Sequence, residues 1–422
     1  MKTARFAACA TLDAILRGRR GLDDLVEASD LDSRDRAFAR LLAATTLRRL
    51  GQIDALIGGA LATPLPPRAH KVQDVLRLGV AQLLFLDTPP HAAVDTAVDL
   101  ARTLGLNAHV KLVNAVLRRL AREGRDQLAG QDAARLNTPD WLWDSWCAAY
   151  GEDTARRIAA AHLAEAPLDI TARDDAPSLA AALEAEILPT GTLRRSTGGA
   201  VETLPGFAEG SWWVQDMAAA LPARLFGPLA GRTIADLCAA PGGKTLQLAA
   251  AGASVWALDR SEARLDRLRQ NLERVRLTAE VIVADAADWQ PPHPLDGVLL
   301  DAPCSATGTT RRHPDAPWTK GPGDVAKLAA AQDRLLHAAV DMVAPGGLIV
   351  FCTCSLQPEE GPARVDALLT AGAPVVRRPI HPDEIGGLTP LITADGDLRS
   401  LPCHLAEKGG MDGFFAARLE KR

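Results

Sequence analysis

The chain has 422 residues, of which 47% are hydrophobic and 23% charged, and its formal net charge is −5. This length is too great for one ordinary core and predicts two or three domains, while the composition is that of a globular protein and excludes a disordered one. A negative net charge excludes a protein that binds nucleic acid over its whole surface, so any RNA contact must be local.

The N-terminal stretch has a basic start, but Asp13 and Arg17 interrupt its apolar residues. It is therefore predicted to form an amphipathic helix rather than a signal peptide. No uninterrupted apolar run approaches the roughly 20 residues that cross a bilayer, so we expect no membrane partner. The seven cysteines are odd in number and scattered, which favours free thiols over a disulfide scaffold and predicts a cytoplasmic protein.

From Ala4 to about Arg125, apolar residues recur at intervals of three and four, which is typical of helices. Prolines at 64, 66, 67, 89 and 90 divide this region into several helices, because proline interrupts the helical hydrogen bonds. We predict an all-α domain over residues 1–130 and a helical linker over 131–165. A small excess of basic over acidic residues in this third of the chain favours it as the RNA-binding part.

The linker carries three tryptophans, Trp141, Trp143 and Trp146. They are most simply explained by packing in a core or between domains. Stacking on RNA bases is the alternative interpretation.

Between residues 167 and 210, the β-prone pieces LDITAR and AVETL flank the helix-prone SLAAALEAE. This pattern predicts a small α+β unit over 166–212. From residue 213 to 422, strands near 233–237, 254–258, 280–284, 297–301 and 348–351 alternate with helices from 244, over 262–275 and over 325–343. Strands separated by helix-length segments predict parallel crossovers and a doubly wound, Rossmann-like α/β sheet.

The first strand of this sheet leads into the turn DLCAAPGGKT, which covers residues 236–245. Its small residues would let a ligand approach backbone N–H groups at the start of a helix. A phosphate-binding P-loop would need a glycine where Cys238 stands. The dinucleotide fingerprint is absent as well, because Gly242 and Gly243 are adjacent.

Acidic residues follow the next three strands, at Asp259, Asp285 and Asp301. In such sheets ligands bind at the carboxyl ends of the strands, where carboxylates hold ribose hydroxyls. With the glycine turn, this arrangement suits a ligand that has a ribose and an adenine but no phosphate, and S-adenosylmethionine is the leading candidate. Capping of a helix remains the alternative for each aspartate taken alone.

Two cysteines, Cys304 and Cys354, lie at the ends of the fourth and fifth strands, so both should reach the same sheet edge. The C5 carbon of cytosine is a poor nucleophile, and its methylation needs a thiolate that first adds to C6. The nearby cations of residues 311–313 could assist ionisation of a thiol. The chemistry of the residues does not decide which cysteine attacks.

Other interpretations of the cysteines stay open at this point. Inert, packed thiols are expected at Cys9, Cys147, Cys352 and Cys403. A zinc site formed by Cys238, Cys304, Cys352 and Cys354 is disfavoured, because no Cys-x-x-Cys knuckle is present. A catalytic disulfide between Cys304 and Cys354 is a further alternative.

Four motifs together resemble the Nop/Sun family of RNA cytosine-C5 methyltransferases: DLCAAPGGKT, LLDAPCSATGTTRRHPD, FCTCSLQPEE and DGFFAARL, in the family's order. Over the full chain, including RFAACATLDAIL and VKLVNAVLRRLARE, the sequence is similar to the bacterial Sun type. That type has an N-terminal NusB-like RNA-binding domain and modifies a cytosine of 16S ribosomal RNA.

The resemblance implies a role for each motif residue. Cys354 would attack C6, Cys304 would assist release of the covalent adduct, and Asp301 would contact N3 of the base. Asp259 would bind the ribose of the cofactor and Asp285 its adenine. The methionine end would be held by Lys244 together with Cys238, Ala239, Ala240, Pro241, Gly242 and Gly243. Ala306 stands where the family commonly has glycine, which puts no role in doubt.

The substrate is left open between 16S ribosomal RNA and, as the alternative, a transfer RNA or another ribosomal cytosine. A non-catalytic RNA-binding assembly factor is the alternative of a different class, which the intact motif residues disfavour. We expect a monomer that acts on free RNA or on an early assembly intermediate.

Overall fold

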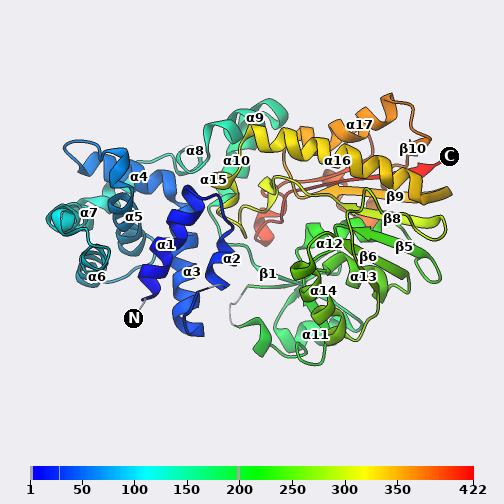
Figure 1. The fold of residues 1–422 in the computed structure, drawn as a ribbon, viewed down its shortest axis with the longest axis horizontal. Coiled ribbons are helices and arrows are strands. Elements are labelled where there is room, and N and C mark those ends of the chain that lie inside the picture. The colour runs from blue at the N-terminus through cyan, green and yellow to red at the C-terminus, as the bar shows by residue number, and fades with distance from the viewer. Residues whose placement is uncertain (1–2, 28, 197–199) are drawn as a thin grey trace. The chain divides into compact units, whose positions relative to one another are not determined.

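The computed structural model describes residues 3–27, 29–196 and 200–422. The chain divides into a helical unit, residues 1–165 with 310–321, and an α/β unit, residues 166–309 with 322–422 (Figure 1). Among the described residues, no helix has both the length and the apolar composition needed to cross a membrane.

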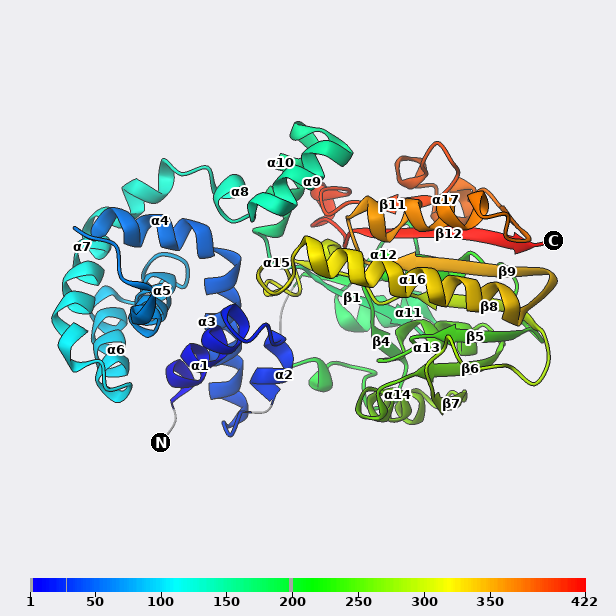
Figure 2. The ribbon, with the colours of Figure 1, turned by 45° about the horizontal axis from the view of Figure 1, so that its top comes forward.

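The helical unit is all-α, as the periodicity predicted, and the expected amphipathic N-terminal helix is α1. Its central helix, α5, packs among α1, α3, α4, α6 and α7 (Figure 2). Most residues of α5 from Val72 onward are buried, and these include the polar side chains of Asp74 and Gln82. The helices of the unit are α1 (Ala4–Leu16), α2 (Leu22–Glu27), α3 (Ser33–Arg48), α4 (Leu50–Ala60), α5 (His70–Leu84), α6 (Pro90–Thr103), α7 (Val110–Ala129), α8 (Ala133–Leu136), α9 (Asp140–Tyr150), α10 (Glu152–His162) and α15 (Ala316–Thr319).

A segment distant in sequence, residues 310–321, completes this unit. The indole Nε1 of Trp318 donates to the carbonyl of Leu47 at 3.0 Å, and its ring packs against the helical core. The backbone N–H of Leu22 donates to Asp315 Oδ2 at 3.2 Å. Nothing in the sequence pattern indicates this association, because the segment has no periodicity of its own.

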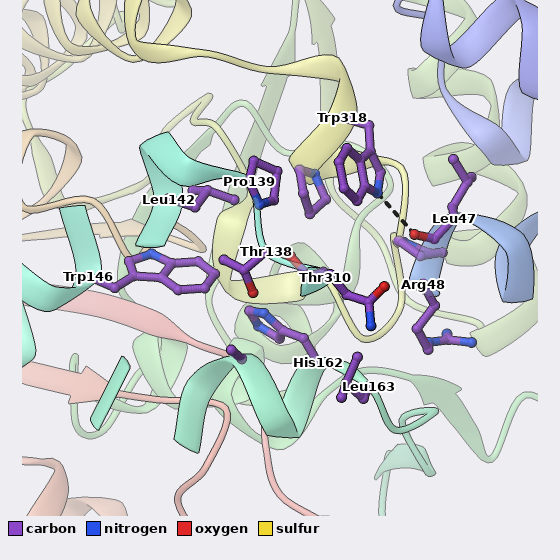
Figure 3. Close-up of a pocket in the computed structure, with 14 residues that line it drawn as sticks. Leu47, Arg48, Thr138, Pro139, Leu142, Trp146, His162, Leu163, Thr310 and Trp318 are labelled. Atoms are coloured by element: carbon purple, nitrogen blue, oxygen red, sulfur yellow. Dashed lines mark hydrogen bonds between the residues drawn. The ribbon is translucent and has the colours of Figure 1, made fainter. Parts of the chain in front are cut away.

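The tryptophans of the linker have different environments. Trp146 is 1% exposed, and its ring meets that of His162 edge to face, with 5.4 Å between centroids (Figure 3). These rings border a small cavity of about 20 Å³ that Trp318 and Arg48 also line, enough for about one water molecule. The guanidinium groups of Arg135 and Arg156 each lie 5.3 Å from the Trp143 ring. For Trp146, the packing interpretation is confirmed.

The α/β unit begins with a small antiparallel sheet of order β2-β3-β1-β4 beside α11. The β-prone piece AVETL does not form a strand, because Val201–Thr203 is a turn of 3₁₀ helix. Val201 and Leu204 both pack against the same apolar cluster, and a spacing of three residues on one side fits a 3₁₀ turn rather than a strand. The elements are β1 (Leu168–Ala172), α11 (Ala176–Leu183), β2 (Glu186–Ile187), β3 (Leu193–Arg195) and β4 (Trp212–Val214).

The large sheet has the order β10-β12-β9-β8-β5-β6-β7. Strands β5 to β9 are parallel, as the alternation of strands and helices predicted. The sheet is mixed rather than wholly parallel, because β12 runs antiparallel between β9 and β10. Its elements are α12 (Met217–Arg224), β5 (Thr233–Leu237), α13 (Gly243–Ala250), β6 (Ser254–Asp259), α14 (Glu262–Val275), β7 (Glu280–Val283), β8 (Leu295–Asp301), α16 (Pro322–Met342), β9 (Val343–Thr353), α17 (Pro362–Thr370), β10 (Val375–Arg377), β11 (Leu398–Ser400) and β12 (Phe414–Lys421).

Helices cover both faces of this sheet. On one face, α16 and α17 pack against β8, β9 and β12 (Figure 2). On the other, α12 and α13 pack against the residues of β5 and β9 that point the opposite way. Burial on both faces explains why strands such as β8 have near-continuous apolar sequences. The carboxyl ends of the parallel strands remain as the place where polar residues gather.

Acid should weaken the helical unit through His162. Burial, together with the charges of Arg311 and Arg48, lowers its pKa to about 3, whereas an unfolded histidine has a pKa of about 6.5. Between these values the unfolded state binds one more proton, so stability is full above pH 6.5 and is lost as the pH falls. Well inside this window, the free energy of unfolding should drop by about 1.4 kcal/mol per pH unit.

Urea unfolding of the wild type and of His162→Gln, measured at several pH values in this window, checks this expectation. Carboxylates contribute equally to both proteins, so the variant should show the smaller dependence on pH. Parallel curves would contradict the assignment.

Candidate functional site

A cavity of about 290 Å³ lies at the carboxyl ends of the parallel strands. This is close to the smallest pockets that hold small molecules. The cavity brings together predicted site residues from five successive strand ends, namely Cys238, Ala240, Asp259, Asp285, Asp301, Cys304 and Cys354. The other predicted residues of the glycine turn, Ala239, Pro241, Gly242, Gly243 and Lys244, do not line it.

The glycine turn links β5 to α13 through unusual backbone conformations. Cys238 has φ 65° and Gly242 has φ 110°. A Cβ atom on Gly242 would lie 3.0 Å from Leu268 Cγ, so this position needs glycine both for its conformation and for its space. The turn thereby starts α13 at Gly243, beside the cavity.

Lys244 is buried and contacts Asp301 rather than the cavity. Its Nζ donates to Asp301 Oδ2 at 2.7 Å and lies 4.9 Å from the centroid of the Phe414 ring. Burial is the largest single influence and lowers the pKa of Lys244, but the acidic groups around it, Asp301 foremost, together outweigh burial and raise the pKa. Lys244 therefore remains a cation that holds the Asp301 carboxylate in place.

Asp259 and Asp285 present their carboxylates differently. Asp259 is 3% exposed, and its Oδ1 accepts from the backbone N–H of Ser261 at 3.0 Å. Its Oδ2 lies 3.3 Å from Arg264 Nη1 but accepts no hydrogen bond among the described residues. A buried carboxylate oxygen that lacks a donor and borders a cavity is suited to a hydroxyl group of a ligand.

Asp285 is held by Arg334 of α16. Arg334 Nη2 donates to Asp285 Oδ2 at 2.8 Å, and the backbone N–H of Ala287 donates to Oδ1 at 3.0 Å. The Arg334 hydrogen bond lowers the pKa of Asp285. The carboxylate is thus kept ionised at the edge of the cavity.

The two strand-end cysteines are in contact. Cys304 Sγ and Cys354 Sγ lie 3.4 Å apart, on the loops that follow β8 and β9. The hydrogen bond with Cys354, then burial, raises the pKa of the Cys304 thiol well above its usual value. Either thiol can donate in this contact, and a protonated Cys304 would be placed to donate its S–H to Cys354.

The loop that carries Cys304 is fixed by the C-terminal motif. The backbone N–H of Gly308 donates to the Cys354 carbonyl at 2.9 Å, and the N–H of Gly413 donates to the Gly308 carbonyl at 2.9 Å. Three of the motifs found in the sequence therefore meet at Gly308. Ala306 has φ 57°, a conformation that glycine adopts more easily than alanine.

Several cavity residues were not predicted from the sequence. Leu328, Ala331, Arg334 and Leu335 come from one face of α16, and Arg260 and Arg264 follow β6. The spacing of the α16 residues is helical, but it does not tell which face of the helix borders a ligand. Among the described residues, no group of three or more His, Cys, Asp or Glu side chains could hold a metal ion.

The order of the parallel strands and the cavity at their carboxyl ends define a Rossmann-like methyltransferase fold. Two family models match: residues 223–420 match the 16S rRNA methyltransferase RsmB/F and residues 2–122 the NusB family. The chain belongs to the RsmB/F family of ribosomal RNA methyltransferases.

Relatives named ribosomal RNA small subunit methyltransferase B match over nearly the whole chain. The protein of Pseudomonas putida is 37% identical and the alignment covers 99% of this chain and 98% of that one. The protein of Vibrio cholerae is 36% identical, with 99% and 97% covered.

Solved structures agree with the fold. The crystal structure of PH0851 has a TM-score of 0.74 at 22% identity and covers 98% of each chain. A methyltransferase homolog protein from Pyrococcus horikoshii has a TM-score of 0.55 at 24% identity, with 66% of this chain and 94% of that one covered.

Substitution of Gly308 by alanine should destabilise the α/β unit. The added Cβ would lie 2.1 Å from the Gly413 carbonyl oxygen, which is backbone and cannot move aside without displacing β12. We expect a loss of about 1–3 kcal/mol in the free energy of unfolding, typical of overpacking, measured by urea denaturation.

Gly323→Ala is the matched control. It lies in the first turn of α16, and a Cβ there meets no atom within 4 Å. This variant should be as stable as the wild type or slightly more stable. If Gly308→Ala were as stable as Gly323→Ala, the backbone at Gly413 would have to move aside without cost, and the prediction would be wrong.

Proposed function

We propose that this protein transfers a methyl group from S-adenosylmethionine to C5 of a cytosine in 16S ribosomal RNA, through a covalent adduct between Cys354 and C6. The observation that carries the proposal is the pair of thiols, 3.4 Å apart, at the edge of a cavity lined by acidic strand ends. The names of the full-length relatives support ribosomal RNA of the small subunit as the substrate.

The cavity residues fit the proposed cofactor. Asp259 Oδ2 is buried and receives no hydrogen bond from the residues that the structure describes, so it would accept from a ribose hydroxyl. Asp285 would accept from the adenine amino group, while Leu328 and Leu335 border the same cavity with apolar side chains. The turn from Cys238 to Gly243 stays the predicted neighbour of the methionine end. Direct contact of Lys244 with that end also stays a prediction. Bound S-adenosylmethionine supplies an electrophilic methyl group.

The two cysteines divide the work because their environments differ. The thiolate of Cys354 adds to C6, forming a C–S bond and making C5 nucleophilic. Donation of the Cys304 S–H stabilises negative charge on Cys354 before attack and again when the thiolate leaves. After C5 has been methylated, its proton passes to solvent water, the C5–C6 double bond is restored, and the C–S bond breaks as the Cys354 thiolate leaves. Cys304 assists this release.

Asp301 would orient the base. Lys244 Nζ fixes its Oδ2, and the Cys352 thiol lies 3.6 Å from its Oδ1. A carboxylate held in this way at the cavity wall would meet the N3 edge of cytosine, where negative charge accumulates after thiolate addition. A proton taken up at N3 from solvent would neutralise this charge, and the Asp301 carboxylate would accept a hydrogen bond from the resulting N3–H.

Replacement of each cysteine should affect methyl transfer and covalent attachment to RNA in a different way. Cys354→Ala should abolish methyl transfer to 16S RNA, whereas Cys304→Ala should accumulate protein covalently bound to RNA, because the adduct forms but is not released. Denaturing gels with labelled RNA show the covalent species.

Cys147→Ala, which changes a thiol on α9, should behave as the wild type. If Cys304→Ala gave no trapped species, the division of roles would be wrong. Bisulfite sequencing of ribosomal RNA from a deletion strain would identify the modified nucleotide. If the deletion strain kept every 5-methylcytosine of its 16S ribosomal RNA, the proposed substrate would be excluded.

Asp285→Ala should weaken binding of S-adenosylmethionine. Loss of a charged acceptor commonly costs about 1–3 kcal/mol, which corresponds to an affinity lower by about 5-fold to 150-fold. Isothermal calorimetry measures this directly. Asp288→Ala is the control, because Asp288 also approaches Arg334, at 3.9 Å, but does not line the cavity. Unchanged affinity for Asp285→Ala would remove this residue from the cofactor site.

A further inference from the structure

A buried carboxylate lies beneath both reactive-cysteine loops. Glu360 is 0% exposed and ends a short 3₁₀ turn, Pro358–Glu360, that follows β9. Its Oε1 accepts from the backbone N–H of Ser305 at 2.9 Å and from Gln332 Nε2 at 3.4 Å. Its Oε2 accepts from the hydroxyl of Ser355 at 2.6 Å and also from the hydroxyl of Ser305.

The donors show what this carboxylate connects. Ser305 directly follows Cys304, and Ser355 directly follows Cys354, although the two pairs lie on different strands' loops. The two serine hydroxyls also lie 3.1 Å from each other. One side chain therefore fixes the residue next to each reactive thiol, and with it the distance between the two loops.

Glu360 itself does not line the cavity. A buried charge is costly unless hydrogen bonds compensate for its lost hydration, and here four donors from three residues do so. Burial raises the pKa of Glu360, while the hydrogen bonds from the two serines oppose that rise. A neutral apolar residue would fill this space without the loss of hydration that a charge suffers. The arrangement therefore indicates a role that needs a hydrogen-bond acceptor at this position.

We propose that Glu360 is a positioning residue that holds the thiols of Cys304 and Cys354 at contact distance. The value of that contact for catalysis rests on the function proposed above, but the contact itself can be measured without any methyl transfer. Glu360 acts through Ser305 and Ser355 and touches neither cofactor nor base.

The test is cross-linking of the two thiols in the full-length protein by dibromobimane. Each thiolate displaces one bromide, so two thioether bonds form and two bromide ions leave, and the product becomes fluorescent only when both have reacted. Mass spectrometry of the digested protein identifies the bridge between Cys304 and Cys354. The Cys304→Ser variant gives the background.

Glu360→Gln should lower the rate of this cross-link by about tenfold, because displacement of reacting groups by about an ångström has effects of that size or larger. The rate of alkylation by monobromobimane, which needs only one thiol, should change much less. The variant's kcat should fall while its KM for S-adenosylmethionine stays unchanged, since Glu360 is remote from the cofactor.

Glu359→Gln is the matched control, because it removes the same charge from the exposed neighbouring residue. It should cross-link as the wild type does. If Glu360→Gln does not fold, Ser355→Ala serves instead, because it removes the hydroxyl that joins the Cys354 loop to the carboxylate. Wild-type cross-linking in the folded variant would overturn the proposal. Methyl transfer that survives Cys354→Ala would refute the proposed function but leave the cross-linking result for Glu360 intact.

Discussion

The parallel pairing of β8 with β9 is the constraint on which the site depends. In this register Asp301 of β8 lies opposite Cys352 of β9, so the loops that follow the two strands begin at the same edge of the sheet. Cys304 and Cys354 follow a few residues later on adjacent loops, which is why their sulfur atoms can meet. A shift of the register by one residue would reverse the faces of every side chain in β9 and separate the thiols.

Much of the site could be predicted because the carboxyl ends of parallel strands share one edge. Asp259, Asp285 and Asp301 lie at the ends of three such strands, and the sequence alone predicts that they lie there together. The ionic partner of Lys244 could not be predicted, because Asp301 comes from another strand and their contact depends on packing. Arg334 was missed for the same reason, since helical spacing does not specify which face of α16 borders the cavity.

Part of the fold could likewise be predicted from the sequence, and part could not. Strands β5 to β9 and helix α14 were expected from alternation and periodicity, and they are present. The antiparallel strand β12 was not expected, because nothing in its apolar sequence indicates the direction in which it enters the sheet. AVETL has strand propensity, but local packing of Val201 and Leu204 prevails over that weak preference.

Residues 310–321 belong to the helical unit, although they are far in sequence from the rest of that unit. Trp318 and Asp315 belong to the helical unit, yet in the sequence they come after Cys304 and before α16, both of which belong to the α/β unit. A fragment cut after residue 165 would lack part of its own core and would expose the apolar surface that Trp318 covers. The helical unit therefore cannot be exchanged between proteins as a simple N-terminal block: recombination that preserves its packing must also carry along a piece from within the catalytic half.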